Sequence, residues 1–384
     1  MRRAPAVLAA LLACAGASRA AAQDSVFGIR GLGLLDRGVS GKSAALGGGF
    51  VVFDPSAAVN PASLAGWHTT AGWAVGAGSF RSFDYGTGTS SLSATRFPVV
   101  GFAGGIGEKV VVAITASDYL DRNWSVQQTD TVSPRGTPVV ASDNTQSAGG
   151  VTDLRLAMAY RLPNITVGFG AHVLTGSTNT SVSRQFPDDS AFVSYTQAQT
   201  TNYTGFGFSA GALVSPLPGL VTGASVRVNG RLRATTTDTA ADVPMPVEVN
   251  AGFYDQPLPG LAVAGTVGWA SWSRAAGALA AAGQARSRDV WSVGLGVEVG
   301  VLRLGRRPLP LRFGYRWRQL PFPIGGDATT PGPALSEHAV TTGLGFDTAG
   351  GRATVDLGLD IGSRAAGTLS ESFTTLYVGL TIRP

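Results

Sequence analysis

Residues 311–322 read LRFGYRWRQLPF, and this stretch decides the fold class. Its alternate positions form an apolar set and a basic set, namely Leu311, Phe313, Tyr315 and Trp317 against Arg312, Arg316 and Arg318. Because successive side chains of a strand point to opposite faces, the pattern predicts a strand with one aromatic and one basic face. The aromatic face suits either the core of a soluble sheet or the lipid around a membrane barrel. In a barrel, the arginines would line the interior.

Composition favours the membrane barrel. The chain has 384 residues, of which 53 are glycine and only 14% are charged, and its mean hydropathy is +0.17. Beyond the N-terminal region, no apolar run reaches the roughly 18 residues that a membrane-spanning helix needs. An apolar, glycine-rich chain without such helices fits a transmembrane β-barrel, whose strands show only weak, alternating hydrophobicity.

Residues 1–22 have the pattern of a secretory signal peptide. Two arginines precede the apolar run AVLAALLA, and small residues follow it, so we expect export and cleavage after Ala22. Cys14, the only cysteine, lies in LLAC within this segment, which leaves its lipidation an open alternative. Once the signal is removed, the chain has no thiol for a disulfide or a metal site.

The charged and histidine residues argue against other classes of function. The processed chain has 26 basic and 24 acidic residues and no basic run, so we expect no nucleic-acid partner. The three histidines, His68, His172 and His338, show no spacing typical of a catalytic triad or a metal site. We therefore predict that the protein is not an enzyme and has no metal or cofactor.

From Trp67 onward, the sequence consists of alternating runs, of which GRATVDLGLDIG at 351–362 is a clear example. These runs predict about fourteen antiparallel strands, an even number as bacterial barrels have. The predicted strands cover residues 68–82, 91–104, 108–121, 151–162, 165–176, 201–214, 220–233, 244–255, 260–273, 288–301, 309–319, 337–347, 352–363 and 371–383.

The connections between these strands alternate in length. Short turns such as IGEK, LPN, SPLPG and TAGG alternate with longer polar segments at 122–150, 177–200, 274–287 and 320–336, which we interpret as loops. Outer-membrane barrels have short turns at one rim and longer loops at the other. A soluble all-β fold, the alternative, is not expected to sort its loops in this way.

The segment before the strands has no sustained alternation. We divide the chain into a signal peptide (1–22), an N-terminal plug (23–66) and a transmembrane β-barrel (67–384). The stretch GKSAALGGGFVVFDPSAAVNPASLAGW at 41–67 resembles the N-terminal hatch of the FadL-like outer-membrane transport family. The Asn-Pro-Ala motif of the family's hatch matches this sequence at Asn60, Pro61 and Ala62. Residues 309–384 resemble the closing strands of that family and of its PorV-like relatives.

This resemblance implies a plugged, monomeric fourteen-stranded barrel in outer-membrane lipid. It also implies passive uptake of hydrophobic small molecules of the long-chain fatty acid or hydrocarbon type. The PorV-like relatives imply an alternative role, as an outer-membrane partner of secretion-system proteins. The resemblance further implies a kink in the third strand. Here the alternation of that strand ends near Asp118, a costly residue on a lipid-facing position.

The inward-facing charges are the remaining candidate site residues. Because unpaired charge in a confined lumen is costly, we expect pairing, such as Glu298 with Arg312 or Arg316. Arginine has a planar fork of donors that matches a carboxylate, so Arg312, Arg316 and Arg318 could also bind a ligand head group. Alternatively, they could hold the plug through Asp54.

Overall fold

The computed structural model describes residues 26–35, 39–84, 89–133, 136, 138–187, 192–300, 302–304, 307–329, 332–366 and 369–384. The predicted signal peptide, with Cys14 and the cleavage site at Ala22, lies outside these residues. No helix in the described part of the chain is long and apolar enough to cross a membrane.

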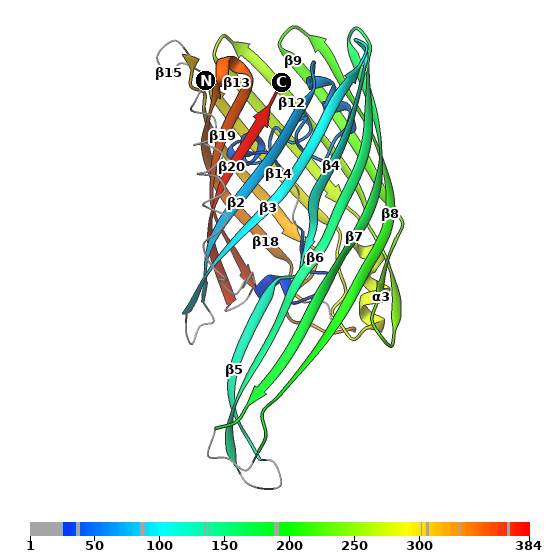
Figure 1. Cartoon of the computed structure of the whole chain (residues 1–384), viewed down its shortest axis with the longest axis vertical. Helices are drawn as coiled ribbons and strands as arrows, with labels where there is room; N and C mark the ends of the chain where they lie inside the picture. Colours follow the sequence, from blue (N-terminus) through cyan, green and yellow to red (C-terminus); the bar gives the residue numbers. More distant parts are fainter. Residues whose placement is uncertain are drawn as a thin grey trace.

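The structure is a closed antiparallel barrel of fourteen strands, as the sequence predicted (Figure 1). Three barrel strands are interrupted: β4 continues as β5, β9 as β10, and β11 as β12. The strands are β2 Ala71–Asp84, β3 Thr89–Ile106, β4 Val110–Asp121, β5 Trp124–Val132, β6 Val139–Arg161, β7 Ile165–Gln185, β8 Tyr195–Leu217, β9 Leu220–Asn229, β10 Arg231–Thr235, β11 Ala240–Pro244, β12 Val247–Leu258, β13 Leu261–Ala270, β14 Val290–Val299, β17 Leu311–Leu320, β18 Leu335–Thr348, β19 Ala353–Ala366 and β20 Leu369–Ile382. Pairing of β2 with β20 closes the ring.

The two faces of each strand meet different surroundings. In β17, the stretch quoted above, Phe313 and Tyr315 are 53% and 40% exposed on the outside, whereas Arg312 is 4% exposed inside. Strand β6 alternates in the same way, with Leu156 outside and Arg155 inside. A continuous apolar outer face and a polar inner face are the arrangement of a barrel in a bilayer.

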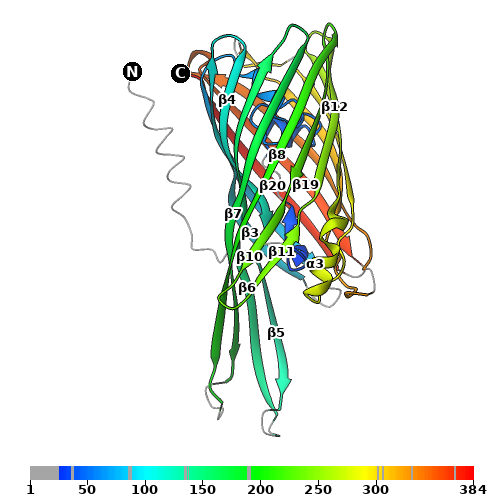
Figure 2. The same cartoon turned by 90° about the vertical axis from the view of Figure 1, so that its right-hand side faces the viewer.

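Two of the four predicted loops are wrong, because strands continue through them. Residues 122–150 hold β5 and the first half of β6, and residues 177–200 hold the end of β7 and the start of β8. These strands form a sheet that projects from one end of the barrel, opposite the C-terminus (Figure 2). Both of its faces meet solvent, so both are polar, and the apolar alternation that predicts a barrel strand is missing.

The N-terminal segment, defined here as residues 26–35 and 39–67, lies inside the barrel (dark blue in Figure 1). It contains η1 Val26–Gly28, β1 Leu34–Leu35, α2 Gly41–Ala45 and η2 Pro61–Gly66. The remaining short elements are η4 Trp272–Ala275, α3 Ala276–Ala281, β15 Arg303–Leu304, β16 Arg307–Pro308 and η5 Ala349–Gly351. The predicted loop at 274–287 thus contains a short helix.

Candidate functional site in the barrel lumen

Glycines in the wall let the backbone of the N-terminal segment approach the strands. A Cβ atom on Gly168 of β7 would lie 2.4 Å from the Ala62 nitrogen, and one on Gly314 of β17 would lie 2.4 Å from the Gly47 nitrogen. Gly47 also has a φ of 61°, which L-residues with side chains rarely adopt. The high glycine content therefore serves, at these positions, to accommodate a segment packed against the inner wall.

The predicted hatch motif forms the start of η2. Asn60 caps this helix, because its Oδ1 accepts a hydrogen bond from the Ala62 nitrogen at 3.0 Å while its Nδ2 donates to the Val52 carbonyl at 3.0 Å. Pro61 occupies the first helical position, where its missing N–H is no loss. Asn60 is fully buried against Gly211 of β8, whose absent side chain leaves room for the amide.

Wall arginines hold the N-terminal segment through its backbone carbonyls. Arg155 donates to the Ala57 carbonyl at 3.3 Å, and Arg161 donates to the Ala65 carbonyl at 2.7 Å. The sequence did not indicate these contacts, because every residue has a backbone carbonyl and the residue type does not show which carbonyl accepts a hydrogen bond.

Asp54 contacts its own segment. Its carboxylate accepts hydrogen bonds from the hydroxyl of Ser40, from that of Ser43 at 2.5 Å and from the Ser56 nitrogen at 2.9 Å. Burial raises the pKa of this carboxyl above its ordinary value of 3.8, and the hydrogen bonds oppose that rise. The sequence suggested a contact between Asp54 and a wall arginine. In the structure, Asp54 instead connects α2 to the turn before η2 through these hydrogen bonds.

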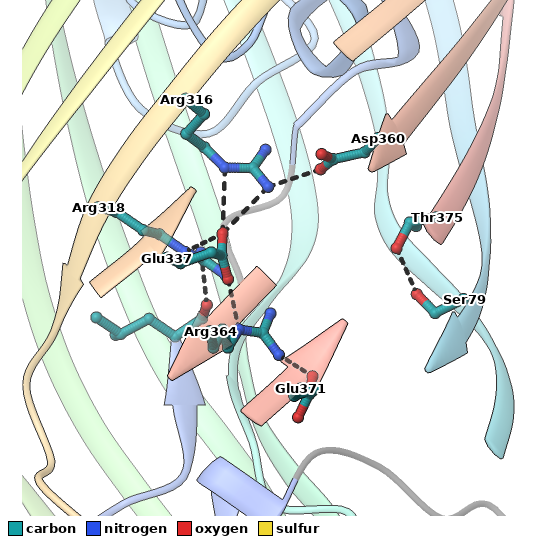
Figure 3. Close-up of polar contacts among 9 residues, drawn as sticks. Ser79, Arg316, Arg318, Glu337, Asp360, Arg364, Glu371 and Thr375 are labelled. Atoms are coloured by element: carbon teal, nitrogen blue, oxygen red, sulfur yellow. Dashed lines mark hydrogen bonds and ion pairs between the residues drawn. The ribbon is translucent and has the colours of Figure 1, made fainter. Parts of the chain in front are cut away.

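A ladder of alternating charges crosses four strands on one side of the lumen. Arg318, Glu337, Arg364 and Glu371 are directly opposite one another in register from β17 to β20 (Figure 3). Glu337 is fully buried and accepts from Arg318 at 2.7 Å and from Arg364 at 2.6 Å. Glu337 was not among the predicted site residues, because it was the first residue of the predicted strand 337–347 and adjoined the predicted loop.

The predicted arginines fall into two groups. Arg316 binds Asp360 at 2.6 Å and Glu337 at 3.2 Å, and so joins the ladder beside Arg318 (Figure 3). Arg318 also donates to the Leu35 carbonyl of the N-terminal segment at 3.2 Å.

Arg312 belongs to a second ion cluster. It binds Glu298 at 2.6 Å, one of the two pairings expected from the sequence, and Asp356 at 2.5 Å. Glu298 also lies 3.5 Å from the ammonium of Lys42 on α2. The N-terminal segment is therefore linked to the wall by an ion pair as well as by carbonyl contacts.

A cavity of about 120 Å³ lies between the N-terminal segment and strands β13, β14 and β17. Most of its exposed lining is apolar, and Leu35, Val39 and Val51 of the N-terminal segment contribute to it. Arg316 and Arg318 reach its edge. The cavity thus offers an apolar surface next to two cations, and its walls belong jointly to the barrel and to the N-terminal segment.

The barrel wall is incomplete beside β4. The β3–β4 ladder ends at the pair Val99 and Ser117, so residues 89–98 of β3 pair only with β2 among the described strands. The β4–β6 register shifts between Asp118 and Leu120, and β4 ends at Asp121. Asp118, the predicted kink residue, lies at this opening.

Two features bridge the opening. Arg96 of β3 binds Asp121 at 2.5 Å, and β1 pairs with the end of β4, with Leu34 opposite Asp121. A second cavity, of about 360 Å³, lies along the break. The wall is therefore closed here by a salt bridge and by the N-terminal segment rather than by a strand ladder.

No group of three His, Cys, Asp or Glu side chains in the described ranges could hold a metal ion.

Asp153, His172 and Ser209 form a buried hydrogen-bonded chain that was not predicted from the sequence. These residues are separated by 19 and 37 positions, and only the strand register brings them together.

Comparison with solved structures places this geometry among known barrels. The toluene transporter TbuX of Ralstonia pickettii aligns with a TM-score of 0.57 at 16% identity, over 93% of this chain and 100% of that one. A FadL homologue of Pseudomonas aeruginosa gives 0.56 at 12% identity, over 95% and 100%. The Pseudomonas putida toluene transporter TodX gives 0.55 at 15% identity, over 93% and 99%.

The chain has the fold of the FadL-like outer-membrane transporters. No protein-family model and no curated protein matches its sequence. The FadL-like fold covers nearly the whole chain, and these neighbours are described as transporters and channels rather than enzymes. At these identities, the likeness establishes the fold alone.

Proposed function

We propose that this protein resides in the bacterial outer membrane and lets hydrophobic small molecules pass inward without an energy source. The observation that carries this proposal is the apolar cavity shared by the barrel wall and the N-terminal segment. Burial of apolar surface in such a cavity supplies affinity without ion or nucleotide chemistry. Two of the named neighbours, TbuX and TodX, are described as toluene transporters, which is consistent with a small apolar ligand.

The N-terminal segment acts as a hatch in this proposal. It occupies the lumen and is held by replaceable contacts, such as those of Arg155 and Arg318 with backbone carbonyls. A ligand that enters the cavity touches Leu35 and Val39 of the hatch, so its arrival favours displacement of that segment. The opening beside β4 then offers a lateral exit, because β1 and the Arg96–Asp121 salt bridge, rather than a β3–β4 ladder, cover it among the described residues.

Uptake of a fluorescent long-chain fatty acid and of toluene into liposomes tests the proposal. The double variant Arg96→Cys and Asp121→Cys permits a cross-link across the opening with a bifunctional methanethiosulfonate, which joins the two thiols through reducible disulfides. The only natural cysteine lies within the signal peptide, so the reagent meets no other thiol in the processed chain. We expect the cross-link to block uptake and its reduction to restore uptake. Uptake equal to that of empty liposomes would contradict the transport function, and uptake unaffected by the cross-link would contradict the lateral exit.

The projecting sheet supports a second candidate, a partner of a protein secretion system. Strands β5 and β8 form its edges, and exposed edges can pair with an added strand. Removal of residues 127–142 from the tip would then abolish co-purification with secretion-system proteins and leave liposome uptake intact. Loss of uptake without any loss of co-purified protein would instead assign the sheet to transport.

A further inference from the structure

Three polar side chains on adjacent strands form a hydrogen-bonded chain across the lumen from the Glu337 ladder. The Oγ of Ser209 on β8 lies 2.8 Å from Nε2 of His172 on β7. The Nδ1 of His172 lies 2.9 Å from Oδ1 of Asp153 on β6. All three residues are buried on inward-facing positions, with exposures of 6%, 2% and 1%.

This order of groups activates a hydroxyl. An aspartate that binds Nδ1 fixes the imidazole with a proton on that nitrogen, which leaves Nε2 free to accept the serine proton. A serine in contact with such a base is a nucleophile. The contact requires Gly170 between the two side chains, because a Cβ there would lie 2.7 Å from the Ser209 Oγ.

Two buried hydrogen-bond donors come from β9, the strand next to β8. Arg227 is directly opposite Ser209 in register, and Ser225 lies two positions away on the same inner face. Arg227 Nη2 and Ser225 Oγ are buried and have no hydrogen-bond partner among the described residues. The guanidinium of Arg227 reaches back over the chain to Asp153 of β6, which it binds at 2.7 Å, and it also binds Asn229 at 2.8 Å. A base and buried donors are the groups that acyl transfer uses beside a nucleophile.

The surroundings indicate the kind of acyl group. Leu174, two residues beyond His172 on the same inner face, belongs to a buried apolar cluster with Tyr203 and Leu232. Towards the other end of the barrel, Asn60 of the N-terminal segment lies against Gly211. The side chains next to the nucleophile are therefore apolar on one side, and the N-terminal segment covers the other side.

We propose that Ser209 is the nucleophile of an acyl hydrolase that cleaves esters of apolar acyl chains within the lumen. Ser209 attacks the ester carbonyl and forms an Oγ–C bond while His172 takes the hydroxyl proton. The ester C–O bond then breaks, and His172 returns the proton to the leaving alcohol. Water, deprotonated by His172, attacks the acyl carbon and releases the carboxylic acid and free Ser209. Arg227 and Ser225 stabilise the oxyanion formed at each addition.

Labelling by a fluorophosphonate probe tests this activity without reference to transport. The folded, purified barrel is treated with the probe, and peptide mass spectrometry locates the adduct. We expect stoichiometric labelling of Ser209 and hydrolysis of a p-nitrophenyl ester with a medium-length acyl chain. His172→Gln should lower both rates at least 100-fold. The matched control is Ser79→Ala, which removes another buried inward-facing serine that binds Thr375 rather than a histidine.

Heat-modifiable migration on gels verifies that each variant is folded. An unlabelled Ser209 in the folded wild-type barrel would overturn the proposal, even if Ser209→Ala fails to fold. Equal labelling of wild type and His172→Gln would also overturn it, because the serine would then react without its base. Fatty acid or toluene uptake in a barrel that fails both assays would leave the proposed transport function standing.

Discussion

Replacement of Glu337 by glutamine should destabilise the barrel strongly. The carboxylate is fully buried and contacts Arg316, Arg318 and Arg364. In Glu337→Gln, Arg364 keeps Glu371 and Arg316 keeps Asp360, but Arg318 keeps only the Leu35 carbonyl among its described partners. Removing one member of a buried ion network typically costs about 3–5 kcal/mol, because the remaining charge stays buried without its partner.

A loss of about 3–5 kcal/mol corresponds to a change of roughly 100-fold to 4000-fold in the folding equilibrium. Urea unfolding in detergent or lipid vesicles, followed by heat-modifiable gel migration, measures it. Asp143→Asn is the matched control, because it breaks the Asp143–Arg184 salt bridge on the projecting sheet, whose side chains are 29% and 31% exposed. Surface pairs contribute little, so we expect no shift in its midpoint. A Glu337→Gln midpoint equal to that of wild type would refute the reasoning.

Further predictions concern the N-terminal segment. Gly314→Val should displace the N-terminal segment and increase the leakage of sugars into liposomes. Gly104→Val is the control and should not increase leakage, because an added Cβ there meets nothing within 4 Å. Equal leakage through the two variants would contradict the prediction. Asn60→Ala removes a helix cap, so local opening should become about 1–2 kcal/mol easier, measured as faster hydrogen exchange around η2. Because burial raises the pKa of Asp54, ionisation of this carboxyl opposes docking of the N-terminal segment inside the barrel. Docking should be strongest below pH 3.8, weaken as pH rises through the folded pKa, and lose this dependence in Asp54→Asn, as monitored by protease cleavage.

The fold could be predicted because every strand that crosses lipid needs an apolar side chain at each outward-facing position. The apolar side chains of LRFGYRWRQL alternate with polar ones because only one face meets hydrocarbon. Outside the membrane this requirement ends, and β5 and the first half of β6 are strands that lack the alternation. The prediction of strands therefore succeeded as far as the bilayer extends.

The lumen was less predictable, because pairing across a barrel depends on register. Glu298 and Arg312 lie on adjacent strands, and their pairing was expected from the strand order. The contact of His172 with Ser209 required the β7–β8 register to be known to the residue. A shift by one position would turn one of the two side chains to the lipid. Contacts to carbonyls, such as that of Arg161 with Ala65, are independent of the side chain of the accepting residue, so the sequence does not predict them.

The way in which the N-terminal segment is held explains how it could move while the barrel stays intact. Strands of the wall are joined by continuous ladders, such as the 13 register pairs between β18 and β19. The segment instead relies on separate contacts, including those of Arg155 and Arg318 with its carbonyls. A hydrogen bond to a charged group contributes about 1.5–3 kcal/mol and can be replaced by any oxygen that reaches the same guanidinium. Displacement of the segment by a ligand or by water therefore requires the exchange of separate polar contacts and the exposure of apolar side chains such as Leu64 and Trp67, whereas separation of two strands would require the loss of a whole ladder.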